Sequence, residues 1–378
     1  MQIRYSIILF ITVIIFASCE EPFQPDLKNQ QSFLVVDGII SNDAGPYTVK
    51  LSRSAGVDSA RFIPETGALV VLINDSGEED VLSEEQEGVY KSSGLIQGQI
   101  GSFYKLHVEI TSGEIYETEF QEIKNPVEID SFYYNRELYN SPVSNEIHDG
   151  YRFYVSADVN EDNSTYLMWR MTETYEYNSV YKIDYIYFDG LHEFSNPDTL
   201  YTCWRTAEIS QINTLSVSSS DPIYEFPVTF VSKDTKKLSV GYSLQIRQYT
   251  INEETYNYWK ALEDMNTQSG NLYSQQPYQL TGNLKNINNP AEIVLGSFIV
   301  TGVDTKRIFA EPRLQTNNGY NSNCAVDGLL LGNLLSFGGA GIYYVTEDEN
   351  GTLGVVSTGC VDCTLKGGVT AKPDFWIY

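Results

Sequence analysis

The chain has 378 residues, and its 24 lysines and arginines against 50 aspartates and glutamates give a formal net charge of −26. At roughly 150 residues per domain, this length predicts two to three domains with buried cores. Hydrophobic residues at 42% and aromatic residues at 13% exclude a mostly disordered chain. The charge argues against nucleic-acid binding, which needs clustered lysine and arginine. The 28 tyrosines and only 4 methionines favour a β-rich fold.

Residues 1–18 have the pattern of a secretory signal peptide. Arg4 precedes an apolar run over residues 7–16, and Ser18 stands directly before Cys19. The run is shorter than the roughly 20 residues that a membrane-spanning helix needs. A cysteine after small residues resembles a bacterial lipoprotein signal, which implies cleavage before Cys19 and its acylation, with palmitate among the chains. We therefore expect Cys19 to anchor the protein in outer-membrane lipid; the alternative is an ordinary signal peptide with an incidental cysteine.

Residues 19–31 are predicted to form a lipidated tether. Glu20 and Glu21 follow the cysteine and resemble the surface-export signal of Bacteroidota lipoproteins. Two prolines and the lack of apolar periodicity are typical of a linker. A dozen extended residues reach at most about 40 Å, so the body stays near the membrane. We expect a lipid-anchored outer-membrane protein that faces the cell exterior, with the periplasmic face as the alternative.

Residues 32–125 are predicted to form an N-terminal β-sandwich. Short apolar or alternating runs occur over residues 33–36, 47–51, 68–73, 103–110 and 115–120. Turn signals separate these runs, and no helical pattern lies between them. Asn125-Pro126 is the predicted boundary.

Residues 126–378 are predicted to form a C-terminal β-sandwich with long insertions. Strand patterns occur over residues 151–155, 166–170, 182–188, 228–231 and 238–249. Trp169 on a strand after a polar loop is typical of an immunoglobulin-like sandwich. The predicted fold class is therefore mainly β, with two immunoglobulin-like β-sandwich domains in tandem, the second with one helix and long insertions.

The one predicted helix begins after Asn252, whose side chain can cap it. Tyr258, Leu262 and Met265 follow at i, i+4 and i+7, so one face is apolar. We interpret this face as packing on the sheet in preference to binding a ligand.

Six short segments resemble a known family. In chain order they are VDGII at 36–40, GPYTV at 45–49, GNL at 282–284, VLGSF at 294–298, CVDCT at 360–364 and KPDFW at 372–376. Together they resemble the Bacteroidota lipoprotein family described as domain of unknown function 4249. The resemblance implies a surface or outer-membrane lipoprotein, often encoded beside a TonB-dependent transporter. It implies no catalytic residues, because none are established for the family.

Four cysteines remain after Cys19, and they lie late in an exported chain. They are Cys203, Cys324, Cys360 and Cys363. An even number predicts two disulfides, with three possible connectivities. A four-thiolate zinc site is an alternative, although such sites belong mainly to reducing compartments. Redox chemistry would need a helix start at the Cys-x-x-Cys motif, whereas residues 358–368 have a strand and loop pattern.

No recognised catalytic or metal motif occurs, so we predict no enzyme activity, no cofactor and no metal site. The histidines lie far apart, and His107 is interpreted as structural. Asp158 and Asp162 have the spacing of a calcium loop, but Asn163 and Trp169 stand where an EF-hand has Gly and Glu. A looser calcium site near Asp158 stays open, with a solvated hairpin as the alternative.

Tyrosine is concentrated between residues 175 and 187, and it favours protein or sugar binding because it supplies rigid, amphipathic area. We predict that Tyr175, Tyr177, Tyr181 and Tyr185 contribute to such a surface, unless they pack the sandwich.

The sequence therefore predicts a non-enzymatic surface lipoprotein. We expect it to be an accessory or substrate-capturing subunit of a TonB-dependent transporter. The alternatives are a structural or adhesion protein of the cell surface and a glycan or peptide hydrolase.

Overall fold

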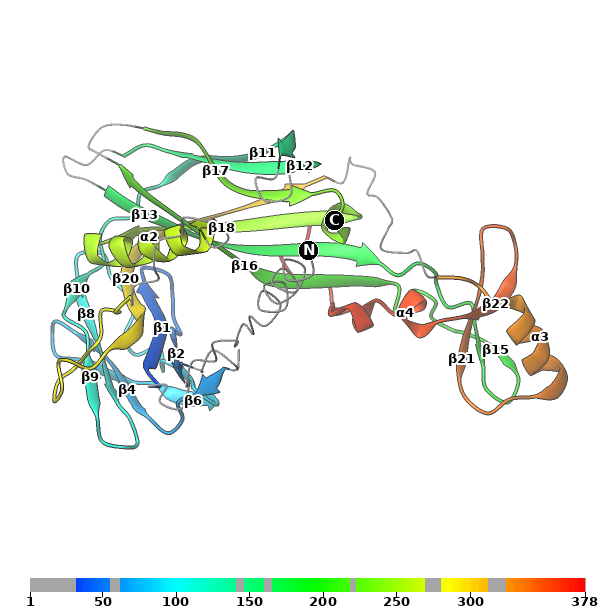
Figure 1. The fold of residues 1–378 in the computed structure, drawn as a ribbon, viewed down its shortest axis with the longest axis horizontal. Helices are drawn as coiled ribbons and strands as arrows, with labels where there is room; N and C mark the ends of the chain where they lie inside the picture. The colour runs from blue at the N-terminus through cyan, green and yellow to red at the C-terminus, as the bar shows by residue number, and fades with distance from the viewer. Residues whose placement is uncertain are drawn as a thin grey trace, which may run out of the picture.

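The computed structural model describes residues 32–54, 62–140, 146–159, 165–217, 222–268, 280–311 and 324–377. These residues form several β-sheets with a few helices, which confirms the predicted mainly β class (Figure 1). The immunoglobulin-like topology stays a prediction. The signal peptide, Cys19 and the whole predicted tether lie outside the described residues. No helix in the described ranges is long and apolar enough to cross a bilayer.

The largest sheet has nine strands and extends through both halves of the chain. Its order is β16 (Thr202–Val217), β13 (Thr165–Asn178), β18 (Gly241–Ile251), β20 (Val294–Ala310), β1 (Leu34–Ser41), β2 (Thr48–Arg53), β7 (Val89–Lys91) and β6 (Ser83–Gln86), with β3 (Ile63–Pro64) beside β2.

Two smaller sheets cover this sheet. The first has the order β19 (Lys285–Asn286), β9 (Ile115–Glu117), β8 (Phe103–Glu109), β4 (Leu69–Asn74) and β5 (Glu79–Val81), with β10 (Gln121–Glu122) on β8. The second has the order β11 (Ile129–Asn140), β12 (Ile147–Ala157) and β17 (Ile223–Ser232).

The N-terminal sandwich buries the alternate residues of its strands, as the two-residue period of a strand requires. Leu34 and Val36 of β1 and Leu106 of β8 are fully buried in one cluster. Phe298 and Val294 of β20 belong to the same cluster. Residues from much later in the chain therefore complete this core, and the boundary at residue 125 stays a prediction.

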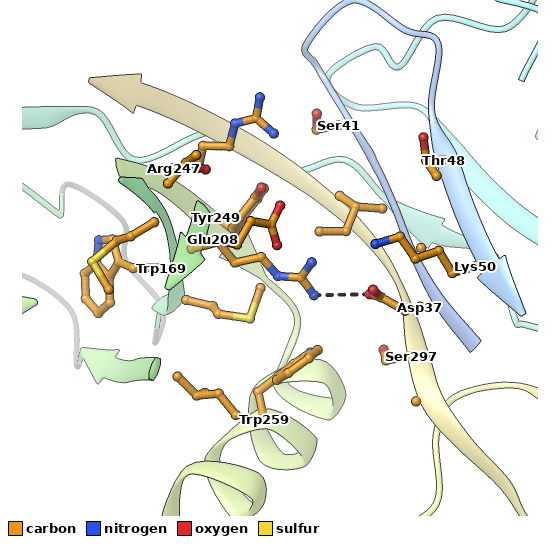
Figure 2. A pocket seen from close by; sticks show the side chains of 18 of the residues that line it. Asp37, Ser41, Thr48, Lys50, Trp169, Glu208, Arg247, Tyr249, Trp259 and Ser297 are labelled. Carbon is orange, nitrogen blue, oxygen red and sulfur yellow. Dashed lines mark hydrogen bonds and ion pairs between the residues drawn. The ribbon is translucent and has the colours of Figure 1, made fainter. Parts of the chain in front are cut away.

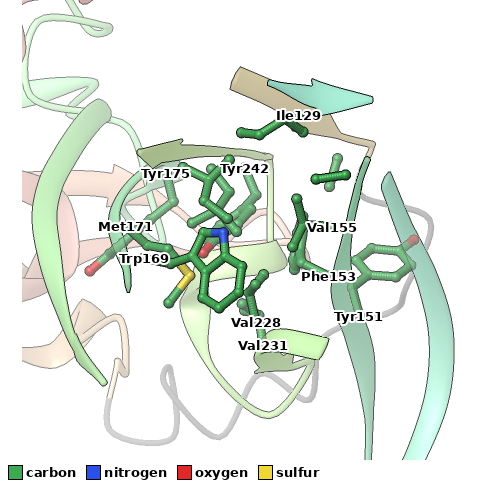
Figure 3. Packing of buried hydrophobic residues seen from close by; sticks show 14 of the residues in the cluster. Ile129, Tyr151, Phe153, Val155, Trp169, Met171, Tyr175, Val228, Val231 and Tyr242 are labelled. Carbon is green, nitrogen blue, oxygen red and sulfur yellow. The ribbon is translucent and has the colours of Figure 1, made fainter. Parts of the chain in front are cut away.

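The central sandwich lies between β11-β12-β17 and the β16-β13-β18-β20 part of the large sheet. Trp169 is buried on β13, as predicted (Figure 3). It stacks on Phe226 at 4.6 Å between ring centroids. Its indole N–H donates to Gln248 at 2.9 Å, and the Gln248 amide donates to the Val127 carbonyl at 2.7 Å. The buried indole N–H therefore has an acceptor, and the Gln248 side chain links the sheet to Val127, near the start of the C-terminal part of the chain.

Strand β20 belongs to both sandwiches. Residues 294–301 pair in parallel with β1, and residues 302–310 pair antiparallel with β18. The change occurs at Gly302, where a Cβ atom would lie 2.2 Å from the carbonyl oxygen of Lys124. Only glycine allows the linker between the two halves to pass so close to β20.

Helix α2 (Glu253–Gln268) covers the sheet face opposite the central core. Asn252 accepts a hydrogen bond from the Thr255 N–H at 2.8 Å, which confirms the predicted cap. Tyr256 and Trp259 pack beside buried Met168 and Tyr249. The Gly296 N–H donates to the Tyr258 hydroxyl at 3.0 Å, so the helix also contacts β20.

A distal lobe lies at one end of the molecule (Figure 1). Its sheet has the order β15 (Leu191–Glu193), β14 (Tyr185–Tyr187), β21 (Tyr343–Glu347) and β22 (Leu353–Val356), and α3 (Gly328–Phe337) packs on it. The remaining short helices are η1 (Lys236–Leu238), α4 (Thr358–Val361) and η3 (Cys363–Lys366).

Both predicted disulfides are present, and they fix the connectivity that the sequence left open. Cys203 pairs with Cys363, and Cys324 pairs with Cys360. The strand and loop prediction for residues 358–368 is wrong, because Asp362 accepts the Thr364 N–H at 2.9 Å and starts η3. Since each cysteine of the Cys-x-x-Cys motif bonds elsewhere, all four thiols are occupied and the zinc and redox alternatives are excluded.

Non-reducing peptide mapping should recover the 203–363 and 324–360 linkages. Replacing Cys203 and Cys363 with serine should lower the free energy of unfolding by about 2–4 kcal/mol. The 324–360 disulfide joins cysteines 36 residues apart, whereas the 203–363 disulfide joins cysteines 160 residues apart. Removing the 324–360 disulfide should therefore cost about 1 kcal/mol less than removing the 203–363 disulfide. A 360–363 linkage would contradict the structure.

Candidate binding cleft

An open cleft of about 770 Å³ lies where the two sandwiches meet. β1 and β2 line one side, and β13, β16 and β18 line the other. α2 contributes Tyr258 and Trp259 at one end. Figure 2 shows Asp37 and Lys50 on the first side, Arg247 and Glu208 on the second, and Trp259 on the helix.

The cleft is balanced in charge, although the chain as a whole is strongly acidic. Its lining includes the cations Lys50, Arg170 and Arg247 and the carboxylates Asp37, Asp43 and Glu208. The whole chain has 24 basic and 50 acidic residues. Basic side chains are therefore concentrated here relative to the rest of the molecule, and they favour a ligand that bears acidic groups.

Arg170 crosses the cleft and connects its two sides. It donates to Asp37 at 3.3 Å, the contact that Figure 2 marks with a dashed line. Its guanidinium also lies 5.2 Å from the centre of the Trp259 ring. Arg170 faces Arg247 directly in the β13–β18 ladder, and like charges at such positions repel. Asp37 and Trp259 offset this repulsion.

The polar groups of the cleft differ in their exposure and in their partners. Arg247 is exposed, and no carboxylate of the described residues lies within ion-pair distance of it or of Lys50. Trp259 Nε1 is buried, and the described residues supply no acceptor for it. Burial raises the pKa of Tyr249, so its phenol stays neutral near pH 7. Lys50 and Arg247 are exposed hydrogen-bond donors, and they suit an acceptor-rich ligand.

The described lining contains hydroxyls and carboxylates, but neither histidine nor cysteine. In the described ranges, no three histidine, cysteine or acidic side chains converge as a metal site would require. The arrangement supports recognition by charge, hydrogen bonding and aromatic contact.

His107, interpreted as structural, contacts Glu117 at 2.7 Å on the outer sheet. The looser calcium site that stays open near Asp158 would include residues 160–164, which lie outside the described residues.

The four predicted binding tyrosines do not form one surface. Tyr175 and Tyr177 are 3% and 1% exposed in the central core, so their prediction as surface contacts is wrong. They lie at odd positions of β13, the side that faces β12 and β17. Tyr181 and Tyr185 pack in the distal lobe, where the Tyr181 hydroxyl donates to the Cys324 carbonyl at 3.3 Å.

A family model described as "Domain of unknown function (DUF4249)" matches residues 20–307. The chain belongs to this family. No curated protein matches the chain.

The segments that carry the DUF4249 resemblance have structural roles around β20. The Asn283 side chain donates to the Phe298 carbonyl at 2.7 Å and accepts its N–H at 2.9 Å, as a neighbouring strand would. A Cβ atom on Gly38 would lie 3.0 Å from the Phe298 ring. Gly296 has a φ of 82° and lies against the Val36 backbone, where a Cβ atom would meet the Val36 oxygen at 1.9 Å.

The charged residues of the cleft were not predicted from the sequence. A signal for two of them exists, because Asp37 interrupts the apolar β1 and Arg170 interrupts a run of buried residues in β13. A charge at such a position often has a specific partner. Local patterns do not reveal that Asp37 and Arg170 are partners. Their contact depends on the β1–β20–β18–β13 strand order.

Replacing Tyr177 with alanine should lower the free energy of unfolding by about 3–5 kcal/mol, because its ring is buried. Its hydroxyl donates to the Cys363 carbonyl at 2.7 Å, so Tyr177→Phe should cost about 1 kcal/mol. Tyr224→Ala is the control, since Tyr224 is 78% exposed and should change stability by less than about 0.5 kcal/mol. Urea denaturation measures all three, and a neutral Tyr177→Ala variant would contradict the burial.

Proposed function

We propose that this DUF4249 protein is a non-enzymatic lipoprotein of the outer-membrane surface that captures a ligand as an accessory subunit of a TonB-dependent transporter. The lipoprotein-type sequence around Cys19 supports the anchor, and Glu20 and Glu21 support the outward orientation. The family resemblance supports the transporter as partner.

The cleft is the observation that carries the binding role. It combines exposed charges of both signs with the Trp259 ring and neutral tyrosine hydroxyls. Such a set can bind a polar ligand through several weak contacts. A short tether would hold the cleft within about 40 Å of the membrane, which is within reach of a transporter opening.

Purification of the native lipidated protein in mild detergent tests the partner. With an affinity tag after Tyr378, we expect a TonB-dependent transporter to co-purify in near-stoichiometric amount, as identified by mass spectrometry. Purification without a transporter would refute this part of the proposal.

The anchor has its own test. Cys19→Ala should abolish acylation and move the protein from the outer-membrane fraction to the soluble fraction, because a chain without acyl groups has no lipid anchor. Ser18→Ala is the matched control and should leave the protein in the membrane. Unchanged membrane retention of Cys19→Ala would exclude lipid anchoring at this position. Protease shaving of intact cells tests orientation, and a protected protein would face the periplasm.

A further inference from the structure

β16 is the last strand of the nine-stranded sheet, so one of its edges faces away from β13 (Figure 1). The C-terminal segment pairs with this outer edge at a single point. The Trp204 N–H donates to the Val369 carbonyl, and the Val369 N–H donates to the Trp204 carbonyl, both at 2.8 Å. Strand pairing at this edge is therefore already present, but it is limited to Trp204.

The register identifies the next outward-directed groups. In an antiparallel sheet, the N–H and C=O of one residue both point toward the same neighbouring strand, and those of the next residue point to the opposite side. Backbone groups that point to one side therefore recur at every second residue. Because Trp204 bonds outward, Thr206 and Glu208 also direct their backbone groups outward. The 2.9 Å contact between the Thr206 and Thr174 hydroxyls fits this assignment, since side chains approach closely in pairs without backbone bonds.

These outward groups are accessible and lack partners in the described part of the chain. Thr206 and Glu208 are both exposed. No described residue donates to or accepts from their backbone. An unpaired strand edge of this kind is a template for a further strand.

The open edge has defined ends. Val369 occupies it at Trp204, and Arg205 donates to the Lys366 carbonyl at 3.5 Å there. At the other end, Thr214 donates to Glu263 of α2 at 2.5 Å. The open stretch is therefore residues 205–211. Residues 208–212 also line the cleft, so the edge and the cleft are continuous.

Basic residues lie on both faces of the sheet on the β16 side. On the cleft face, Arg170 is on β13, the strand next to β16, and Arg247 is on β18, one strand further from the edge. On the other face, burial and the positive charges of Arg205 and Lys366 lower the pKa of Lys236 to about 8. This concentration of cations in a chain with a net charge of −26 is complementary to an acidic partner.

We propose that an extended acidic segment of another polypeptide adds antiparallel to the outer edge of β16 at residues 205–211, with its carboxylates directed into the cleft. The residues opposite Thr206 and Glu208 share the face of Arg170 and Arg247, since opposite residues of a ladder project to the same side. A polypeptide supplies the alternating donors and acceptors that this edge requires. The inference names the ligand class of the proposed capturing role and rests on that role for its biological setting.

Fluorescence anisotropy with the purified full-length protein in detergent tests the proposal. The probe is a labelled octapeptide of alternating threonine and glutamate, and the comparison peptide alternates threonine and lysine. We expect saturable binding of the acidic peptide that is at least tenfold tighter than that of the basic one. Arg247→Gln should reduce this preference. Equal binding of the two peptides, or no saturable binding, would overturn the proposal.

Backbone pairing predicts a further asymmetry. Glutamates that face the cleft are the residues that bond to Thr206 and Glu208, so N-methylation of every glutamate should abolish binding. N-methylation of every threonine should preserve it, because those N–H groups point away from β16. Equal effects of the two modifications would exclude the proposed pairing, and this comparison leaves the protein unchanged.

Two substitutions of Glu208 distinguish the contribution of its backbone N–H to binding from that of its side chain. Glu208→Pro removes the outward N–H but no β13 bond, so it should weaken binding at least tenfold while keeping the fold by circular dichroism. Glu208→Ala keeps the N–H and removes a negative charge, so it should bind at least as tightly as the natural chain. Equal binding by both variants would overturn the proposal.

Two other results have separate meanings. A dimer in sedimentation equilibrium that Glu208→Pro dissociates would assign the edge to a second copy and overturn the acidic-segment proposal. If the protein binds the acidic peptide but no transporter co-purifies with it, the transporter role alone is refuted. If a transporter co-purifies but the peptide does not bind, the strand addition alone is refuted.

Discussion

Both sandwiches depend on one strand, β20, because each takes half of it. Residues 294–301 complete the N-terminal sheet beside β1, and residues 302–310 complete the central sheet beside β18. Phe298 is buried in the first core and Ala310 in the second. Since one continuous strand pairs with β1 over its first half and with β18 over its second half, neither sandwich can rotate freely against the other. The cleft between them therefore has a defined shape.

This constraint explains which residues near the junction are small or polar. Gly38, Gly296 and Gly302 each lie where another chain segment passes too closely for a side chain. Asn283 takes the place of a neighbouring strand beside Phe298. On the cleft side, Asp37 and Arg170 join the two sandwiches by an ion pair. Because both side chains are partly exposed, we expect this pair to contribute at most about 1 kcal/mol, so the strand is the main connection.

Local patterns were sufficient for much of the fold. The alternation in β2, β8 and β12 and the Asn252 cap of α2 were predictable, because each depends on residues near in sequence. The parallel pairing of β1 with β20 was not, since its register is set by contacts between residues far apart in the chain. The even number of cysteines predicted two disulfides, but the pairing of Cys203 with Cys363 depends on where η3 lies.

The candidate site was less predictable than the fold. Alternation in β13 places Tyr175 and Tyr177 on one face, but it does not say which face is covered, and the β11-β12-β17 sheet covers theirs. The opposite face carries Arg170 and opens into the cleft. An exposed tyrosine and a core tyrosine look alike in sequence, whereas an arginine between buried residues is a more informative signal.

Native-state hydrogen exchange in low denaturant tests the central claim, that β20 makes the two sandwiches one cooperative unit. The most protected amides of each core should report the same opening free energy and the same denaturant dependence. Leu106 N–H represents the N-terminal sandwich, because it donates to Thr118 at 3.0 Å within that buried core. Leu244 N–H on β18 represents the central sandwich, where the side chain is fully buried. Equal values for these two amides would support the account, and a separate, lower-energy opening of the N-terminal sandwich would contradict it.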